Sequence, residues 1–138
     1  MSQHTQAIGP TLVPYFGYRD AAAAIEWLSK AFGFKKTQAF PGPDGTIIHA
    51  EMSYGNGVIM LGTATEEQSP QAHSGGPGIY VCVDNVDTHY ERAKAAGAKI
   101  VYGPEDTDFG TRRYRTLDPE GYEWSFGTYR PSPVEANA

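Results

Sequence analysis

The 138-residue chain has a single cysteine, Cys82, and no long apolar run. One cysteine excludes an intramolecular disulfide, so a reducing compartment fits, and Cys82 is expected to be a small buried hydrophobe. No segment approaches the roughly 20 apolar residues that a membrane span requires. The polar stretch 1–10 also lacks the apolar core of a signal peptide. The sequence therefore predicts a cytoplasmic protein with no membrane partner.

Excess basic charge is absent as well. With 11 Lys and Arg against 16 Asp and Glu, the formal net charge is −5 at pH 7. This balance argues against a nucleic-acid partner, because phosphates require a basic surface. An acidic surface instead tolerates or attracts a cationic ligand. The apolar share of 40% is that of a globular domain.

Two helix candidates begin and end with the same residue types. They run from Asp20 to Gly33 and from Asp84 to Gly97, each opening on a capping aspartate and closing on a glycine. Each follows a short apolar strand, at 12–18 and 79–83. Each precedes a Pro/Gly-rich loop, at 41–45 and 103–106, and then a hairpin. The hairpin strands are expected at 47–54 and 58–61 in the first copy, and at 112–117 and 122–126 in the second. This order predicts a duplicated βαβββ unit.

The repeat sets the predicted organisation of one domain. A polar N-terminal tail at 1–9 precedes the first module at 10–63, and a linker at 64–77 precedes the second module at 78–130. A C-terminal tail covers 131–138. The linker is rich in Gly, Ser, Gln and Glu, and its acidic pair Glu66 and Glu67 is expected to be solvated.

The string Asp118-Pro-Glu-Gly-Tyr-Glu-Trp124 closes the second module. Together with the entry at 18–20, the helix end at 31–34 and the strands at 49–51 and 58–62, it resembles the glyoxalase/bleomycin-resistance/extradiol-dioxygenase (vicinal oxygen chelate) superfamily over about residues 10 to 130. The resemblance implies an α+β fold whose two modules form a cupped, partly open mixed sheet with helices on the convex side. It also implies a cavity for a small organic ligand, and commonly a homodimer.

Strand alternation decides which residues of the first hairpin face that cavity. With Asn56-Gly57 as a two-residue turn, paired residue numbers sum to 113 and Ser53 lies opposite Met60. His49 and Glu51 then share their face. The other, more apolar face is expected under the helix and carries Ile48, Ala50, Met52, Tyr54, Ile59 and Leu61.

In the second hairpin, Trp124 and Phe126 are assigned to the helix face. Ser125 and Glu123 are then left to the cavity, where Arg113 and Arg115 join them. Two interpretations stay open: Arg115 pairs with Glu123 as a structural ion pair, or the arginines bind ligand. Four aromatic residues are expected to border the cavity, either stacking a flat ligand or serving as packing: Tyr15, Phe40, Tyr80 and Phe109.

Metal-dependent members of the superfamily imply four ligand positions, which fall here on Val13, Met60, Gly78 and Ser125. None is a histidine or carboxylate, so we expect no metal and no cofactor, and neither glyoxalase nor extradiol-dioxygenase activity. The loss of these ligands resembles the metal-free bleomycin-resistance branch. His49 and Glu51 supply at most two ligands, and His4, His73 and His89 are poorly placed to complete a site.

Three functions remain open. The first is a ligand-binding protein that sequesters an antibiotic or metabolite without metal. The second is a metal-independent lyase, isomerase or epimerase with His49 and Glu51 as acid and base. The third is a structural or regulatory dimer with a filled cavity. The predicted ligand-binding set is Tyr15, His49, Glu51, Ser53, Met60, Tyr80, Arg113, Arg115 and Ser125.

Overall fold

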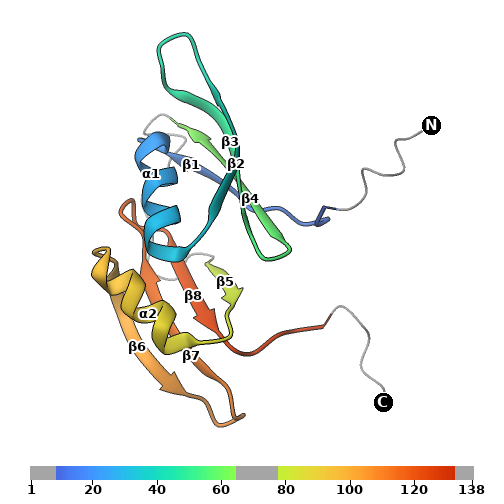
Figure 1. The fold of residues 1–138 in the computed structure, drawn as a ribbon, viewed down its shortest axis with the longest axis vertical. Coiled ribbons are helices and arrows are strands. Elements are labelled where there is room, and N and C mark those ends of the chain that lie inside the picture. Colours follow the sequence, from blue (N-terminus) through green and yellow to red (C-terminus); the bar gives the residue numbers. More distant parts are fainter. Residues whose placement is uncertain (1–8, 65–77, 133–138) are drawn as a thin grey trace, which may run out of the picture. The chain divides into compact units, whose positions relative to one another are not determined.

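The computed structural model describes residues 9–64 and 78–132. The chain divides into two compact units at residues 71 and 72, and each unit holds a four-stranded mixed sheet with its helix (Figure 1). The predicted α+β class and the βαβββ order of each module are confirmed. All of the predicted linker except Ala64 lies outside the described residues, and so do His4 and His73.

The first module contains β1 (Tyr15–Tyr18), α1 (Ala21–Trp27), a π-helical turn η2 (Leu28–Phe32), β2 (Lys35–Pro41), β3 (Ile47–Tyr54) and β4 (Gly57–Thr63). The sheet order is β1-β4-β3-β2, with β1 parallel to β4 and the other pairs antiparallel. The helix begins where Asp20 Oδ1 accepts a hydrogen bond from the Ala23 amide at 3.0 Å. The helical segment ends at Gly33, whose φ of 89° is left-handed.

The second module contains β5 (Ile79–Cys82), α2 (Val86–Ala95), β6 (Lys99–Asp106), β7 (Arg112–Leu117) and β8 (Glu123–Gly127), in the sheet order β5-β8-β7-β6. Two predictions are corrected here. The N-cap of α2 is Asn85 rather than Asp84, because the Asn85 side chain accepts from the Thr88 amide at 3.0 Å. The expected loop at 103–106 is the end of β6, since an edge strand tolerates Pro104.

The core of each module lies between the sheet and its helix. In the first module the helix face is buried at Phe16, Tyr18, Ala50, Met52, Ile59 and Leu61. In the second it is buried at Tyr114, Thr116, Trp124 and Phe126. The predicted helix-face assignments are therefore confirmed, except that Tyr54 is half-buried and Ile48 is 60% exposed. Among the described residues, the helices are too short and too polar to cross a membrane.

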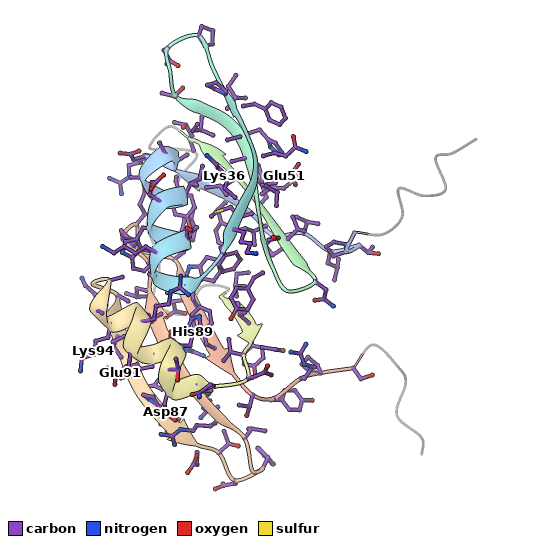
Figure 2. The ribbon with its side chains drawn as sticks, in the orientation of Figure 1. Lys36, Glu51, Asp87, His89, Glu91 and Lys94 are labelled. Atoms are coloured by element: carbon purple, nitrogen blue, oxygen red, sulfur yellow. The ribbon has the colours of Figure 1, made fainter. Side chains whose placement is uncertain are left out.

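Besides Thr116, the second core contains the buried polar side chains of His89 and Asp118. His89 lies on the side of α2 toward the sheet, whereas Glu91 and Lys94 lie on the outer side (Figure 2). The His89 Nδ1 atom is 2.6 Å from the Tyr114 hydroxyl. Asp118 accepts hydrogen bonds from two turn amides, and its other oxygen accepts from the Trp124 indole at 3.1 Å. Both groups are hydrogen-bonded, as burial requires.

The register of the first hairpin differs from the prediction by two residues. Tyr54 pairs with Gly57, so the turn is Gly55-Asn56 and Ser53 lies opposite Val58 rather than Met60. Gly55 adopts a φ of 57°, which glycine allows without strain. Because side chains alternate with a period of two, a shift of two residues leaves every side chain on its predicted face.

Candidate functional site: the open faces of the two sheets

The face of each sheet turned away from its helix is called its open face. On the first open face, one row of neighbours crosses all four strands: Gln38 is opposite Glu51, Glu51 opposite Met60, and Met60 beside Tyr15. Figure 2 shows Glu51 on the side of the sheet away from α1. Glu51 and Met60 are half-buried and Tyr15 is exposed. The row therefore combines a carboxylate, an amide, a thioether and a phenol.

A second row runs beside the first, where Phe40 on β2 pairs with His49 on β3. The two rings stack with centroids 6.2 Å apart. His49 Nε2 is 2.9 Å from Glu51 Oε2, and both side chains are about one-third exposed, at 32% each. The pair offers a charged or proton-transferring group beside an aromatic ring, in contact with solvent. Ser53, also half-buried, lies further along the same face.

The second open face has the equivalent row. Tyr102 is opposite Arg115, Arg115 opposite Ser125, and Ser125 beside Tyr80. Each of these lies 64 or 65 residues after its counterpart in the first row; Tyr80, for example, follows Tyr15 by 65 (80 − 15). The two modules therefore repeat the positions of the side chains on the open face as well as the backbone fold.

Arg115 is half-buried on this face, and its Nε donates to Ser125 Oγ at 3.0 Å. Of the two open interpretations, the ion pair between Arg115 and Glu123 is not observed, because Glu123 lies opposite Leu117 in the observed register. Arg113 donates from Nε and Nη2 to Glu105 Oε2, at 3.1 and 3.0 Å. Hydrogen bonding to Glu105 raises the pKa of Arg113.

Sequence reasoning missed Tyr102. Both arginines of this face lie over its ring, with each guanidinium carbon 5.7 Å from the centroid. The following Gly103-Pro104 suggested that a loop begins there, which hid the continuation of the strand. Alternation from Ile100, which pairs with the buried Thr116, would place Tyr102 on the helix face. The register shift between Ile100 and Tyr102 instead brings Tyr102 opposite Arg115, and the sequence carries no signal for that shift.

Tyr80 and Cys82 line the edge strand β5 on the same face. The Tyr80 hydroxyl donates to the Tyr129 carbonyl at 2.6 Å, and burial is the main cause that raises the pKa of Tyr80. Cys82 is half-buried rather than a core residue, with its Sγ 3.3 Å from the same carbonyl. Phe109 lies in the turn after β6 and is 88% exposed.

The residues at the implied metal positions do not fit a divalent ion. Val13 and Gly78 offer no side-chain donor, and Met60 offers only a soft thioether. Ser125 has an oxygen, but the Arg115 guanidinium already binds it, and that positive charge repels a metal ion. Within residues 9–64 and 78–132, no three His, Cys, Asp or Glu side chains come together.

The family model of the Glyoxalase/Bleomycin resistance protein/Dioxygenase superfamily matches residues 8–126. The chain belongs to this superfamily.

Proteins similar to this chain come from several organisms. An uncharacterized protein of Mycobacterium bovis is 35% identical over 127 residues, covering 87% of this chain and 84% of the relative. The crystal structure of TioX from Micromonospora sp. ML1 is 35% identical with a TM-score of 0.71, covering 86% and 98% of the two chains. Glyoxalase I from Zea mays shares the fold, with a TM-score of 0.73 at 22% identity over 88% of this chain and 45% of that one.

Proposed function

We propose that this protein binds a small organic ligand on its open faces without a metal, as a bleomycin-resistance-type member of its superfamily. The binding residues are the predicted set: Tyr15, His49, Glu51, Ser53, Met60, Tyr80, Arg113, Arg115 and Ser125. Bound ligand would be sequestered rather than transformed. Glu51 gives the first face a carboxylate for a cationic group, in keeping with the net charge of −5.

One observation carries this proposal: Ser125, which stands at one of the implied metal-ligand positions, accepts a hydrogen bond from Arg115. With Arg115 at 3.0 Å from Ser125 Oγ, the second face recognises ligand through hydrogen bonds and charge. The first face supplies Phe40 and Tyr15 as partly exposed aromatic surface beside the His49–Glu51 pair. A few polar groups among aromatic and apolar surface are what small-molecule sites require.

Native mass spectrometry of the full chain as purified, before and after EDTA dialysis, tests the proposal. We expect a stoichiometric organic molecule, identified after denaturation, whose occupancy survives chelation and falls in Glu51→Gln. Lys99→Gln is the control, because it also removes one charge but lies exposed on the edge strand β6. This variant should keep the ligand. A stoichiometric divalent metal that EDTA removes would contradict the proposal.

A second candidate function is metal-independent acid–base catalysis, as in a lyase or isomerase. It is favoured by the 2.9 Å contact between His49 Nε2 and Glu51 Oε2, which orients the imidazole next to solvent. In that case a co-purified molecule should be converted when held with the protein. Turnover that persists in EDTA and is lost in His49→Ala would replace sequestration as the function, whereas an unchanged ligand would exclude catalysis.

We also propose that the protein is a cytoplasmic homodimer, the assembly that the superfamily resemblance implies. Light scattering coupled to size exclusion should give twice the chain mass of 15.0 kDa. A mass of one chain at micromolar concentration would contradict the dimer but would leave the proposal of ligand binding unaffected.

A further inference from the structure

The two modules carry opposite charges at the same position of their open faces. Glu51 and Arg115 are equivalent in the repeat, 64 residues apart (115 − 51), each in the middle of its row. The carboxylate of Glu51 has a partner in His49 at 2.9 Å. Arg115 has no ion pair with any carboxylate of the described residues. Because Arg115 is only half-buried, an anion that approaches from solvent can reach its guanidinium and serve as its counter-ion.

The guanidinium of Arg115 is held in one orientation. Its Nε donates to Ser125 Oγ at 3.0 Å, and its Cζ lies over the Tyr102 ring, 5.7 Å from the ring centroid. Arginine has five N–H donors, and only the one on Nε is used here. Among the described residues, Nη1 and Nη2 have no hydrogen-bond partner. A fixed fork of free donors therefore remains at the end of the side chain.

The neighbouring carboxylates do not fill this fork. Glu105 is taken by Arg113, which sends two hydrogen bonds to the same oxygen. Glu123 lies diagonally from Arg115 on the next strand, opposite Leu117, and forms no ion pair with it. The negative charge of Glu123 nevertheless weakens the positive potential around Arg115, and so does the net charge of −5. A singly charged anion therefore suits the position better than a phosphate dianion.

We propose that Arg115 is the recognition group for a carboxylate of the organic ligand, held by parallel hydrogen bonds from Nη1 and Nη2. The planar fork of a guanidinium matches the two oxygens of a carboxylate, and such bidentate pairs are stronger than neutral hydrogen bonds. The proposal deepens the proposed function and rests on it for the view that the open faces receive the ligand. Ser125 and Tyr102 are positioning residues that set the direction of the fork.

Benzoate, the uncharged benzamide and inorganic phosphate are suitable probes, titrated into the ¹⁵N-labelled full chain while amide shifts of β7 and β8 are followed by NMR. We expect saturable shifts with benzoate, and binding of benzamide and phosphate weaker by at least about tenfold. Arg115→Gln should weaken benzoate by a similar factor. Arg115→Lys should do so too, since lysine keeps the charge without the fork. Arg92→Gln removes the same charge from the exposed surface of α2 and should change nothing.

Equal binding of benzoate and benzamide, equal binding of benzoate and phosphate, or unchanged benzoate binding in Arg115→Gln would overturn the proposal. The amide spectrum of each variant shows whether its fold is retained, and Arg115→Lys provides the test if Arg115→Gln does not fold. A purified protein that holds a metal and no organic ligand, yet binds benzoate through Arg115, would sink only the proposed function. A co-purified ligand without an acidic group would sink only the assignment of Arg115.

Discussion

At the scale of single residues, two glycines leave room for the tyrosines of the edge strands. Gly62 and Gly127 occupy equivalent positions on β4 and β8. A Cβ at Gly127 would lie 2.6 Å from the Tyr80 hydroxyl and 3.1 Å from the Arg112 carbonyl. A Cβ at Gly62 would be 3.5 Å from the Tyr15 hydroxyl and would overlap the Ile48 carbonyl oxygen. Glycine at both positions therefore lets the phenol rings lie on the sheet.

Gly127→Ala should destabilise the protein by about 1–3 kcal/mol, the usual cost of overpacking. Gly62→Ala should cost more, because the obstructing atom is backbone and cannot rotate away as a tyrosine can. Urea unfolding followed by circular dichroism measures both. Gly57→Ala is the control, since its Cβ would meet only the Tyr54 carbonyl at 3.4 Å. A control as costly as the other two would contradict this account.

Asp118 connects the turn of the second hairpin to the core. Its buried carboxylate accepts from the Glu120 and Tyr122 amides and from the Trp124 indole. Asp118→Ala leaves the buried indole N–H unsatisfied and should cost about 1–3 kcal/mol. Chemical denaturation with tryptophan fluorescence would measure the loss. An Asp118→Ala protein as stable as the parent would show that water or another group replaces the carboxylate.

At the scale of elements, Arg112 on β7 joins α2 to the edge strand β6. It donates from Nε and Nη2 to Asp87 of α2, at 3.0 and 2.9 Å, and from Nη1 to Asp106 of β6 at 2.9 Å. Figure 2 labels Asp87 near the beginning of α2. Hydrogen bonding to Arg112 lowers the pKa of Asp87. These charges are exposed, so water and salt weaken their attraction.

The lowered pKa predicts the sign of a pH effect. A carboxyl with a folded pKa below its unfolded value, here about 3.9, stabilises the fold above that value and loses this contribution as the pH falls through the folded pKa. Asp87→Asn should therefore lower the urea midpoint slightly at pH 5, and the difference should shrink as the pH falls through the folded pKa of Asp87. Added salt at pH 5 should also shrink the difference. A difference that is constant across this range would rule out the ionised pair as its cause.

At the scale of the whole molecule, duplication gives two sheets the same backbone and different chemistry. Equivalent positions hold Glu51 and Arg115 in the two modules, and Met60 and Ser125 beside them. The face on β3 and β4 has a carboxylate with its own histidine. The face on β7 and β8 has a guanidinium that binds the serine. The two modules thus differ in the chemistry of their open faces, whereas the helix face of each is buried in the core.

This arrangement predicts that metal ions do not stabilise the protein. The thermal midpoint should be the same in EDTA as in stoichiometric Zn²⁺ or Ni²⁺, because an ion stabilises only when it binds the folded state more tightly than the unfolded one. Differential scanning calorimetry of the full chain measures this. A rise of several degrees that saturates at one ion per chain would contradict the prediction and would reopen metal-dependent chemistry.

The sequence by itself determined the helices, the hairpins, their repetition and the faces of most hairpin residues, but not the strands β2 and β6. The capping side chain of Asp20 and the glycines Gly33 and Gly97 act within a few residues along the chain, and alternation along a strand is equally local. Only the tertiary structure decided the partners across strands: Glu51 with Met60, and Arg115 with Ser125 and Tyr102. Those partners depend on turn geometry and on edge-strand irregularities. Alternation along β7 thus placed Arg115 on the open face. The register of the neighbouring strands decided that its guanidinium has no carboxylate partner within residues 9–64 and 78–132.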